Sequence, residues 1–297
     1  TGSNNTAVGQ NAGANITTAD YNTAVGSDAL KIATTATKNT AIGYEALEAT
    51  TTGSWNTSVG SNSLKSNTTG VSNSALGQAA LGSNTTGSQN TAIGLDALAT
   101  QSTANDNTAV GYFVLRSNTT GTKHVGVGNS ALDANTTGTE NLAIGDHALS
   151  QNTTGSYNIA IGNHSLYTQT TDGTQNVAVG RYSLTYNASG DYNVGCGNGT
   201  LSNNSSGSNN TAVGHNALND STTSSDNTAV GYLALEKNTS GARNVAVGAL
   251  SLDASTTGSD NTAIGYHALT TADGGGNQNT AVGSDSMRYL TTGDGNT

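Results

Sequence analysis

The sequence predicts an all-β fold, a parallel β-roll or β-solenoid of about 17 coils in which each 17-residue repeat forms one coil. The first reason is a phrase, Asn-Thr-Ala-Val-Gly, that returns at a fixed interval along the chain. Fourteen of the sixteen intervals between its closing glycines are 17 residues, and the two that end at Gly180 and Gly283 are 18. The second reason is that apolar residues come in short alternating bursts, typical of strands, rather than in a helical stripe. The closing glycines are Gly9, Gly26, Gly43, Gly60, Gly77, Gly94, Gly111, Gly128, Gly145, Gly162, Gly180, Gly197, Gly214, Gly231, Gly248, Gly265 and Gly283.

The strand of each repeat is expected in the three residues before the closing glycine. Its middle residue is small, as at Ala24, Ser58 and Gly126, whereas its neighbours, such as Thr23 and Val25, are larger. Strand alternation places the two larger side chains on one face and the small residue on the other. We therefore expect the larger pair to face the coil interior, and the small residue to face something that approaches closely, such as another chain. The sequence contains no proline, so every backbone N–H is available for the strand ladder.

After the closing glycine, which is expected to adopt a positive φ, a turn should lead into a second short strand around a recurrent Ala-Leu pair. We expect its leucine, four residues after the glycine, to face the interior as a ladder. Gly13 and Met287 replace it in the outermost repeats, and terminal repeats are often atypical. The ladder consists of Leu30, Leu47, Leu64, Leu81, Leu98, Leu115, Leu132, Leu149, Leu166, Leu184, Leu201, Leu218, Leu235, Leu252 and Leu269.

A polar loop such as Asn-Thr-Thr-Gly closes each coil, with a second turn at a glycine such as Gly70. Four residues before the closing glycine stands an asparagine in sixteen of the seventeen repeats, and His124 is the exception. Asparagines in register can hydrogen-bond along a stack and are good turn formers. We therefore assign this column a structural role.

Charged residues also follow the period. Lys31, Glu48 and Lys65 stand one residue after the leucine in successive repeats, as do Arg116 and Asp133. Stacking would place these opposite charges one coil apart, about 4.8 Å along the array. Such exposed pairs contribute only about 0–1 kcal/mol each, so their expected use is to favour the correct register.

The composition excludes several classes of function. The net charge is −10, and only 9% of the residues are charged, which argues against nucleic acid and against an anionic membrane surface as partners. No stretch approaches the ~20 apolar residues of a transmembrane helix, so no membrane insertion is expected in this segment. The repeat pattern reaches both ends, so we expect residues 1–297 to form a single repeat array, a fragment of a longer fibrous chain.

Each coil offers only two or three sizeable apolar side chains, whereas ordering each of its residues costs about 1–2 kcal/mol of backbone entropy. A single thin array is therefore expected to need partner chains. The row of alanines and glycines suggests close approach of backbones, and three identical chains around an axis form a closed arrangement. The expected partner is thus the chain itself, as a homotrimer.

Asn-Thr-Ala-Val-Gly, and Asn-Ile-Ala-Ile-Gly at residues 158–162, resemble the Ser-Val-Ala-Ile-Gly phrase of the YadA-like head repeats of trimeric autotransporter adhesins. They are equally similar to repeats of phage tail fibres and bacterial surface fibre proteins. The resemblance covers all seventeen repeats, although the family's usual repeat is shorter and the extra residues here fall in the polar loop. It implies a left-handed parallel β-roll, three identical chains, and an extracellular place on a cell surface or virion. A cell-surface glycan or protein receptor is then a further expected partner.

No catalytic, cofactor or metal motif is found, so we expect no enzyme activity, no cofactor and no metal site. His147 and His164 occupy the same slot in adjacent repeats. They are either two exposed histidines or, if that slot faced a threefold axis, part of a cluster of imidazoles around a metal. Asp28 and Glu45 also share that slot, and stacking explains them better than a glycosidase-like pair. Cys196 stands where other repeats have Val, Ile or Leu, so we expect it to be a small buried hydrophobe.

Two further sets of residues leave alternatives open. The recurrent aromatic rings either stack on sugars or cover a strand edge or a subunit seam. Thr-Thr pairs such as Thr68-Thr69 and Thr119-Thr120 suggest a hydroxyl array for binding ice. The aromatic residues before the recurrent Asn are Tyr21, Trp55, Tyr157 and Tyr192, and those after the closing Gly are Tyr44, Tyr112, Tyr232 and Tyr266.

These observations together predict a non-enzymatic structural segment, the rod or head of a homotrimeric attachment fibre of adhesin or tail-fibre type. The alternatives are an extracellular filament whose subunits join end to end, and a Thr-rich ice-binding solenoid.

Overall fold

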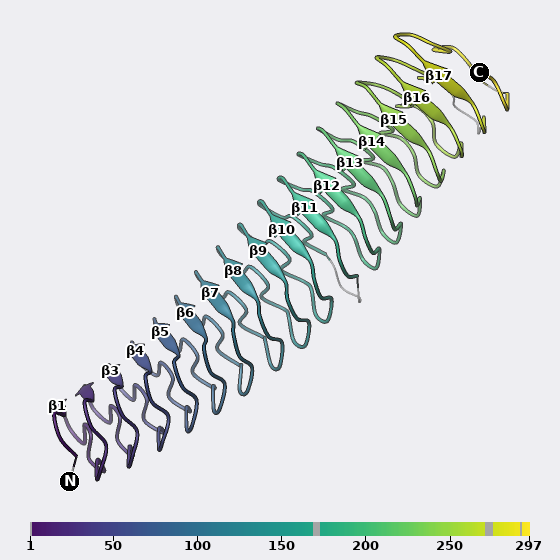
Figure 1. Ribbon diagram of the computed structural model, residues 1–297. Helices are drawn as coiled ribbons and strands as arrows, with labels where there is room; N and C mark the ends of the chain where they lie inside the picture. The colour runs from purple at the N-terminus through teal and green to yellow at the C-terminus, as the bar shows by residue number, and fades with distance from the viewer. Residues whose placement is uncertain (1, 169–172, 271–275, 292) are drawn as a thin grey trace. The chain divides into compact units, whose positions relative to one another are not determined.

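The computed structural model describes residues 2–168, 173–270, 276–291 and 293–297, and it divides into two compact units, 1–144 and 145–297. Among the described residues there are seventeen strands of three residues each and no helix, which confirms the predicted all-β solenoid (Figure 1). The strands of the first unit are β1 Thr6–Val8, β2 Thr23–Val25, β3 Thr40–Ile42, β4 Thr57–Val59, β5 Ser74–Leu76, β6 Thr91–Ile93, β7 Thr108–Val110, β8 Val125–Val127 and β9 Leu142–Ile144. Those of the second unit are β10 Ile159–Ile161, β11 Val177–Val179, β12 Val194–Cys196, β13 Thr211–Val213, β14 Thr228–Val230, β15 Val245–Val247, β16 Thr262–Ile264 and β17 Thr280–Val282.

Within each unit every strand pairs in parallel with the strand of the next coil, so equivalent residues form columns. Thr23, Ala24 and Val25 of β2 lie opposite Thr40, Ala41 and Ile42 of β3. The 18-residue repeat keeps the same register, because β10 pairs in the same way with β11. Residues one repeat apart therefore lie over one another, as the period predicts.

The two faces of the strand are the reverse of the expected arrangement. The small middle residue is enclosed, with Ala24 and Ala41 at 0% exposure, whereas the larger third residue points outward, with Ile42 at 40% and Leu76 at 50%. The reason is volume: the leucine from the opposite side of the coil already fills the interior. In β8 the middle residue is Gly126, because Val114 replaces the alanine found before most ladder leucines and would collide even with an added Cβ. The interior beside the strand therefore accepts a methyl group and little more.

The leucine ladder lies inside, as predicted, but no second strand forms around the Ala-Leu pair. The chain there is a series of turns, and both Asn62 (φ 60°) and Leu64 (φ 48°) are left-handed. This conformation costs an L-residue about 1–2 kcal/mol, and full burial of the leucine side chain returns roughly 1.5–3 kcal/mol. Leu132, with φ 55° and no exposure, shows the same geometry.

The closing glycines adopt the predicted positive φ, between 125° and 142°. They are also places of close approach between coils. A Cβ on Gly43 would overlap the carbonyl group of Gly60 in the next coil. Conformation and contact both require glycine at this position.

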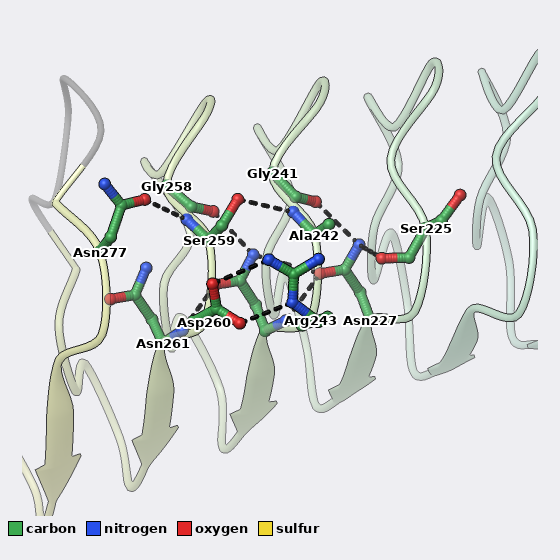
Figure 2. A network of polar contacts seen from close by, with 11 residues as sticks. Ser225, Asn227, Gly241, Ala242, Arg243, Gly258, Ser259, Asp260, Asn261 and Asn277 are labelled. Carbon is green, nitrogen blue, oxygen red and sulfur yellow. Dashed lines mark hydrogen bonds and ion pairs between the residues drawn. The ribbon is translucent and has the colours of Figure 1, made fainter.

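The predicted asparagine ladder is present and buried. Asn227 Oδ1 accepts hydrogen bonds from the backbone N–H of Asn244 (2.9 Å) and from its side-chain Nδ2 (3.1 Å). Asn227 Nδ2 donates to the carbonyl oxygen of Gly241 at 2.9 Å, which fixes the polar loop to the strand side of the coil (Figure 2). Each asparagine thus joins two coils and closes a loop, which explains why the column tolerates little else.

His124 is built into this ladder. Its backbone N–H donates to Asn107 Oδ1 (2.9 Å), its Nδ1 accepts the N–H of Asn141 (3.2 Å), and its Nε2 lies 2.6 Å from the oxygen of Gly138. Burial lowers the pKa of His124 to about 4. A neutral imidazole therefore reproduces the acceptor and donor of the asparagine that it replaces.

Candidate functional site

The most extensive candidate site is the outward side of the strands, formed by the first and third residues of each strand and called here the strand face. Its third residues are apolar almost throughout, and many are more than one-third exposed. A contiguous row of exposed apolar side chains is typical of a surface that meets another molecule. The third residues exposed to this degree in β1–β9 are Val8, Ile42, Leu76, Ile93 and Ile144, and those in β10–β17 are Cys196, Val213, Val230, Ile264 and Val282.

The first residues of the strands decide how wide this apolar row is. In β1–β7 they are threonine or serine, so a hydroxyl column runs beside the row. At Val125 in β8 the column becomes apolar, and it continues as Leu142 in β9. In residues 145–297 it is apolar at Ile159, Val177, Val194 and Val245 and threonine elsewhere. The strand face is therefore not uniform: some coils present two apolar side chains and others one.

Cys196 lies on the strand face as the third residue of β12, and it is exposed. The expectation of a buried hydrophobe is therefore wrong. It fails for the same reason as the strand orientation, because the position equivalent to Val and Ile faces outward. Its free thiol makes Cys196 a natural reporter for coverage of this surface.

The aromatic residues before the recurrent asparagine and after the closing glycine border the strand face along the chain. Trp55 is 59% exposed, and the Lys38 ammonium of the preceding coil lies 3.8 Å from the centre of its ring. Tyr44, Tyr112 and Tyr232 on the other border are about half exposed. The rings are available to a subunit seam or to a ligand, and both interpretations remain predictions.

The charged columns form the predicted ion pairs with one change of partner. Lys31 Nζ lies 3.7 Å from Glu48, and Arg116 lies 3.0 Å from Asp133. Lys65, however, pairs with Glu45 at 2.6 Å rather than with Glu48. The long side chain of Lys65 reaches the neighbouring column, in which Glu45 stands. Stacking of equivalent residues in one column does not predict this pair.

These ion pairs also bear on the carboxylate pair of the shared slot. Hydrogen bonds from Asn11 and then Lys31 lower the pKa of Asp28, and hydrogen bonds from Lys65 and then Tyr44 lower the pKa of Glu45. A glycosidase needs one carboxyl whose pKa is raised so that it can act as an acid. Asp28 and Glu45 are both shifted in the opposite direction, so they do not form such a pair.

The threonine pairs use half of their hydroxyls internally. Thr51 Oγ1 donates to the carbonyl oxygen of Thr68 at 3.2 Å, and Thr68 Oγ1 donates to that of Thr85 at 3.0 Å. The second threonine of each pair, such as Thr52 or Thr69, is exposed. One column of hydroxyls, rather than a two-residue-wide array, faces outward.

His147 and His164 do share one slot in adjacent coils, and their rings stack with centroids 5.2 Å apart. In the described part of the chain, no group of three or more His, Cys, Asp or Glu is placed to hold a metal ion. No pocket is found among the described residues either. The same residues contain no helix with the length and apolar character needed to cross a membrane.

No family model matches the chain, and no curated protein matches its sequence.

Proposed function

We propose that this chain is a non-enzymatic rod or head segment of a homotrimeric attachment fibre, extracellular and displayed on a cell surface or virion. The observation that carries the proposal is the strand face, which presents the larger apolar side chains of almost every coil to the outside. Nearly all remaining recurrent residues serve the stacking of coils. The surface that is left over for function is thus, in each unit, a strip that crosses successive coils and suits another repetitive molecule.

Partner chains would add stability that one chain lacks. Full burial of a valine, leucine or isoleucine contributes roughly 1.5–3 kcal/mol, so covering a side chain such as Ile42, 40% exposed, would add about 1 kcal/mol. Over the nine strands of residues 1–144 this amounts to several kcal/mol per chain. In the proposed trimer the chains contact one another through the larger first and third residues of each strand. The enclosed alanines take no part in that contact.

A second copy of the same chain fits this surface better than a globular partner. Every coil repeats the same outward pattern, so two or three parallel copies would match coil for coil along their length. A closed ring of three satisfies every copy equally, as cyclic symmetry requires. The bordering aromatic residues, Trp55 among them, would then lie at subunit seams or remain free for a glycan or protein receptor.

Light scattering on the purified chain tests the proposal, because one chain weighs 29.5 kDa and a trimer three times as much. Ile93→Asp, on the strand face of β6, should reduce the mass to that of a single chain. Thr86→Asp, which places the same charge on the exposed loop column, is the matched control and should leave the trimer intact. A monomeric mass for the unaltered chain at all concentrations would refute the proposal.

Cys196 supplies an independent measurement that does not depend on a variant. Its thiol is exposed in the single chain, so a maleimide should label it quickly only when the strand face is uncovered. We expect slow labelling in the native assembly and fast labelling in denaturant. Equally fast labelling in both states would show that the strand face of β12 is uncovered.

The exposed second threonines, such as Thr52, Thr69 and Thr86, support ice binding as the second candidate, because they stack in register. Thermal hysteresis in a freezing droplet tests it, with Thr69→Lys as the disrupting variant. Electron microscopy of the same preparation separates rods with free ends from the third possibility, filaments joined end to end.

A further inference from the structure

Two histidines stack in neighbouring coils of residues 145–297. His147 and His164 each stand two residues after a closing glycine, and both are half-buried. Their ring centroids are 5.2 Å apart and their planes differ by only 17°. The spacing is close to that of neighbouring strands, so the fold itself sets the separation of the two rings.

The surrounding hydrogen bonds determine which nitrogen of each ring carries the proton. His147 Nδ1 lies 3.0 Å from a carboxylate oxygen of Asp146, which only accepts, so Nδ1 donates. Asn163 Nδ2 donates to the other oxygen of Asp146 at 3.0 Å. This bond orients the amide so that Asn163 Oδ1 faces His164 Nδ1 at 2.9 Å. Both rings therefore hold their proton on Nδ1 and leave the lone pair of Nε2 free.

Two tyrosines restrict the movement of these rings. The Tyr167 ring centroid lies 4.9 Å from that of His164 and 6.1 Å from that of His147. Tyr182, one coil further on, lies 5.6 Å from His164. This packing keeps the two imidazoles next to each other on the surface of successive coils.

We propose that His147 and His164 form a two-histidine site for a borderline divalent transition metal ion, Cu²⁺, Ni²⁺ or Zn²⁺, with water completing the coordination. Imidazole nitrogen is a ligand that these ions prefer. Metal-binding imidazoles characteristically donate their other N–H to an oxygen, as both rings do here through Asp146 and Asn163.

Binding requires both rings to rotate. With metal–nitrogen bonds of about 2.0–2.1 Å, the two Nε2 atoms must come within about 3–4 Å of each other. Because the ring planes now differ by only 17°, the two Nε2 lone pairs run side by side, and each side chain must turn for them to meet at one ion. Neither ring is fully buried, so an ion can approach both from solvent.

Isothermal titration of the untagged full chain with Ni²⁺ at neutral pH tests the proposal. We expect one ion per chain, and His164→Asn should weaken binding by at least about tenfold, the loss that removal of even an outer-shell partner causes. Asparagine is native to the same slot at Asn62 and Asn216, so the variant is compatible with the fold. His147→Asn should give the same loss, and circular dichroism without metal checks that both variants are folded.

His267→Asn is the matched control. It removes a histidine from the same slot, where the flanking coils carry Leu250 and Asp285 instead of a second imidazole. Nickel binding should be unchanged in this variant. Unchanged binding in both His147→Asn and His164→Asn, or an equal loss in His267→Asn, would overturn the proposal.

Discussion

Acid should destabilise this protein through His124, and His124→Asn should remove that sensitivity. The ring lies within the asparagine ladder, where Nδ1 accepts the N–H of Asn141 and Nε2 faces the oxygen of Gly138. A proton added to Nδ1 would set two donors against each other in a buried place. The loss of hydration on burial lowers the pKa of His124 to about 4 from the ordinary 6.5.

The direction of the effect follows from proton linkage. The unfolded chain binds this proton more readily, since its histidine keeps the ordinary pKa. The contribution of His124 to stability is therefore complete above about pH 7, decreases as the pH falls from 6.5 toward 4, and changes no further below about pH 4. Each pKa unit corresponds to about 1.4 kcal/mol, so the full loss is about 3 kcal/mol, of which about 2 kcal/mol is already lost at pH 5.

Urea unfolding followed by circular dichroism at pH 7 and pH 5 measures this loss. Between pH 7 and pH 5, the unaltered chain should lose about 2 kcal/mol more of its free energy of unfolding than His124→Asn does. His215→Asn, which removes an exposed imidazole, should behave like the unaltered chain. Hydrogen exchange at the Asn141 amide adds a local readout in case the coils unfold in parts. An equal acid loss in His124→Asn and the unaltered chain would refute the reasoning.

Three further predictions concern the stack itself. Leu132→Asp should destabilise the chain by about 4 kcal/mol or more, because it buries a charge in a filled interior. Thr137→Asp places the same charge on the exposed loop and should have little effect on stability. Thermal melting of the two variants measures the difference. Gly60→Ala should lower the free energy of unfolding in urea by at least about 2 kcal/mol, because φ at Gly60 is 138° and the added Cβ would collide with the next coil. Gly82→Ala, where φ is not positive, should lower it much less. Deletion of the complete repeat 78–94 should leave the circular dichroism spectrum unchanged, and deletion of half a repeat should disrupt it.

The sequence predicts well which residues lie over one another in successive coils, because this stacking depends only on the period. Columns at 17-residue spacing, the inward leucines and the asparagine ladder follow once equivalent residues are placed over one another. The bond from Asn244 to Asn227 is one instance of what this register implies. Such predictions need no knowledge of the shape of a single coil.

The cross-section of the coil was harder to predict because alternation does not say which face is inside. Relative size suggested that Val25 should be buried and Ala24 outside, yet the structure has Ala24 inside. The informative signal is the narrow choice of residues in the middle of the strand. A position that holds only Ala, Ser or Gly in every repeat has no room for a larger side chain, so it is enclosed. The leucine that encloses it comes from a different part of the coil, which a strand pattern alone does not show.

The missing second strand has a different cause. Leucine is not a turn former, and nothing in its chemistry suggests a left-handed conformation such as that of Leu64. The slot two residues earlier carries a partial signal, since it holds Asn11, Asp28, Gly199 and Asn216, which are residues that tolerate positive φ. A strand through such a slot was an unsound expectation, although His147 and Phe113 in the same slot obscure the pattern.

The inside of every coil is nearly identical, and this has a consequence for where function can lie. A repeated interior of Leu, Ala and Asn cannot distinguish one coil from another, so a chain that paired in the wrong register would lose little burial. Residues that differ between coils must therefore supply register. Many of these are outside, such as Lys123 with Glu140 at 3.3 Å and Arg243 with Asp260 at 2.6 Å (Figure 2). His124, inside the asparagine ladder, is a buried example. The variable outer columns are also exposed, so one coil can there acquire a role toward another molecule that its neighbours lack. Binding sites in such an array are thus expected as short runs of unusual residues in one column, and the stacked histidines of residues 145–297 are such a run.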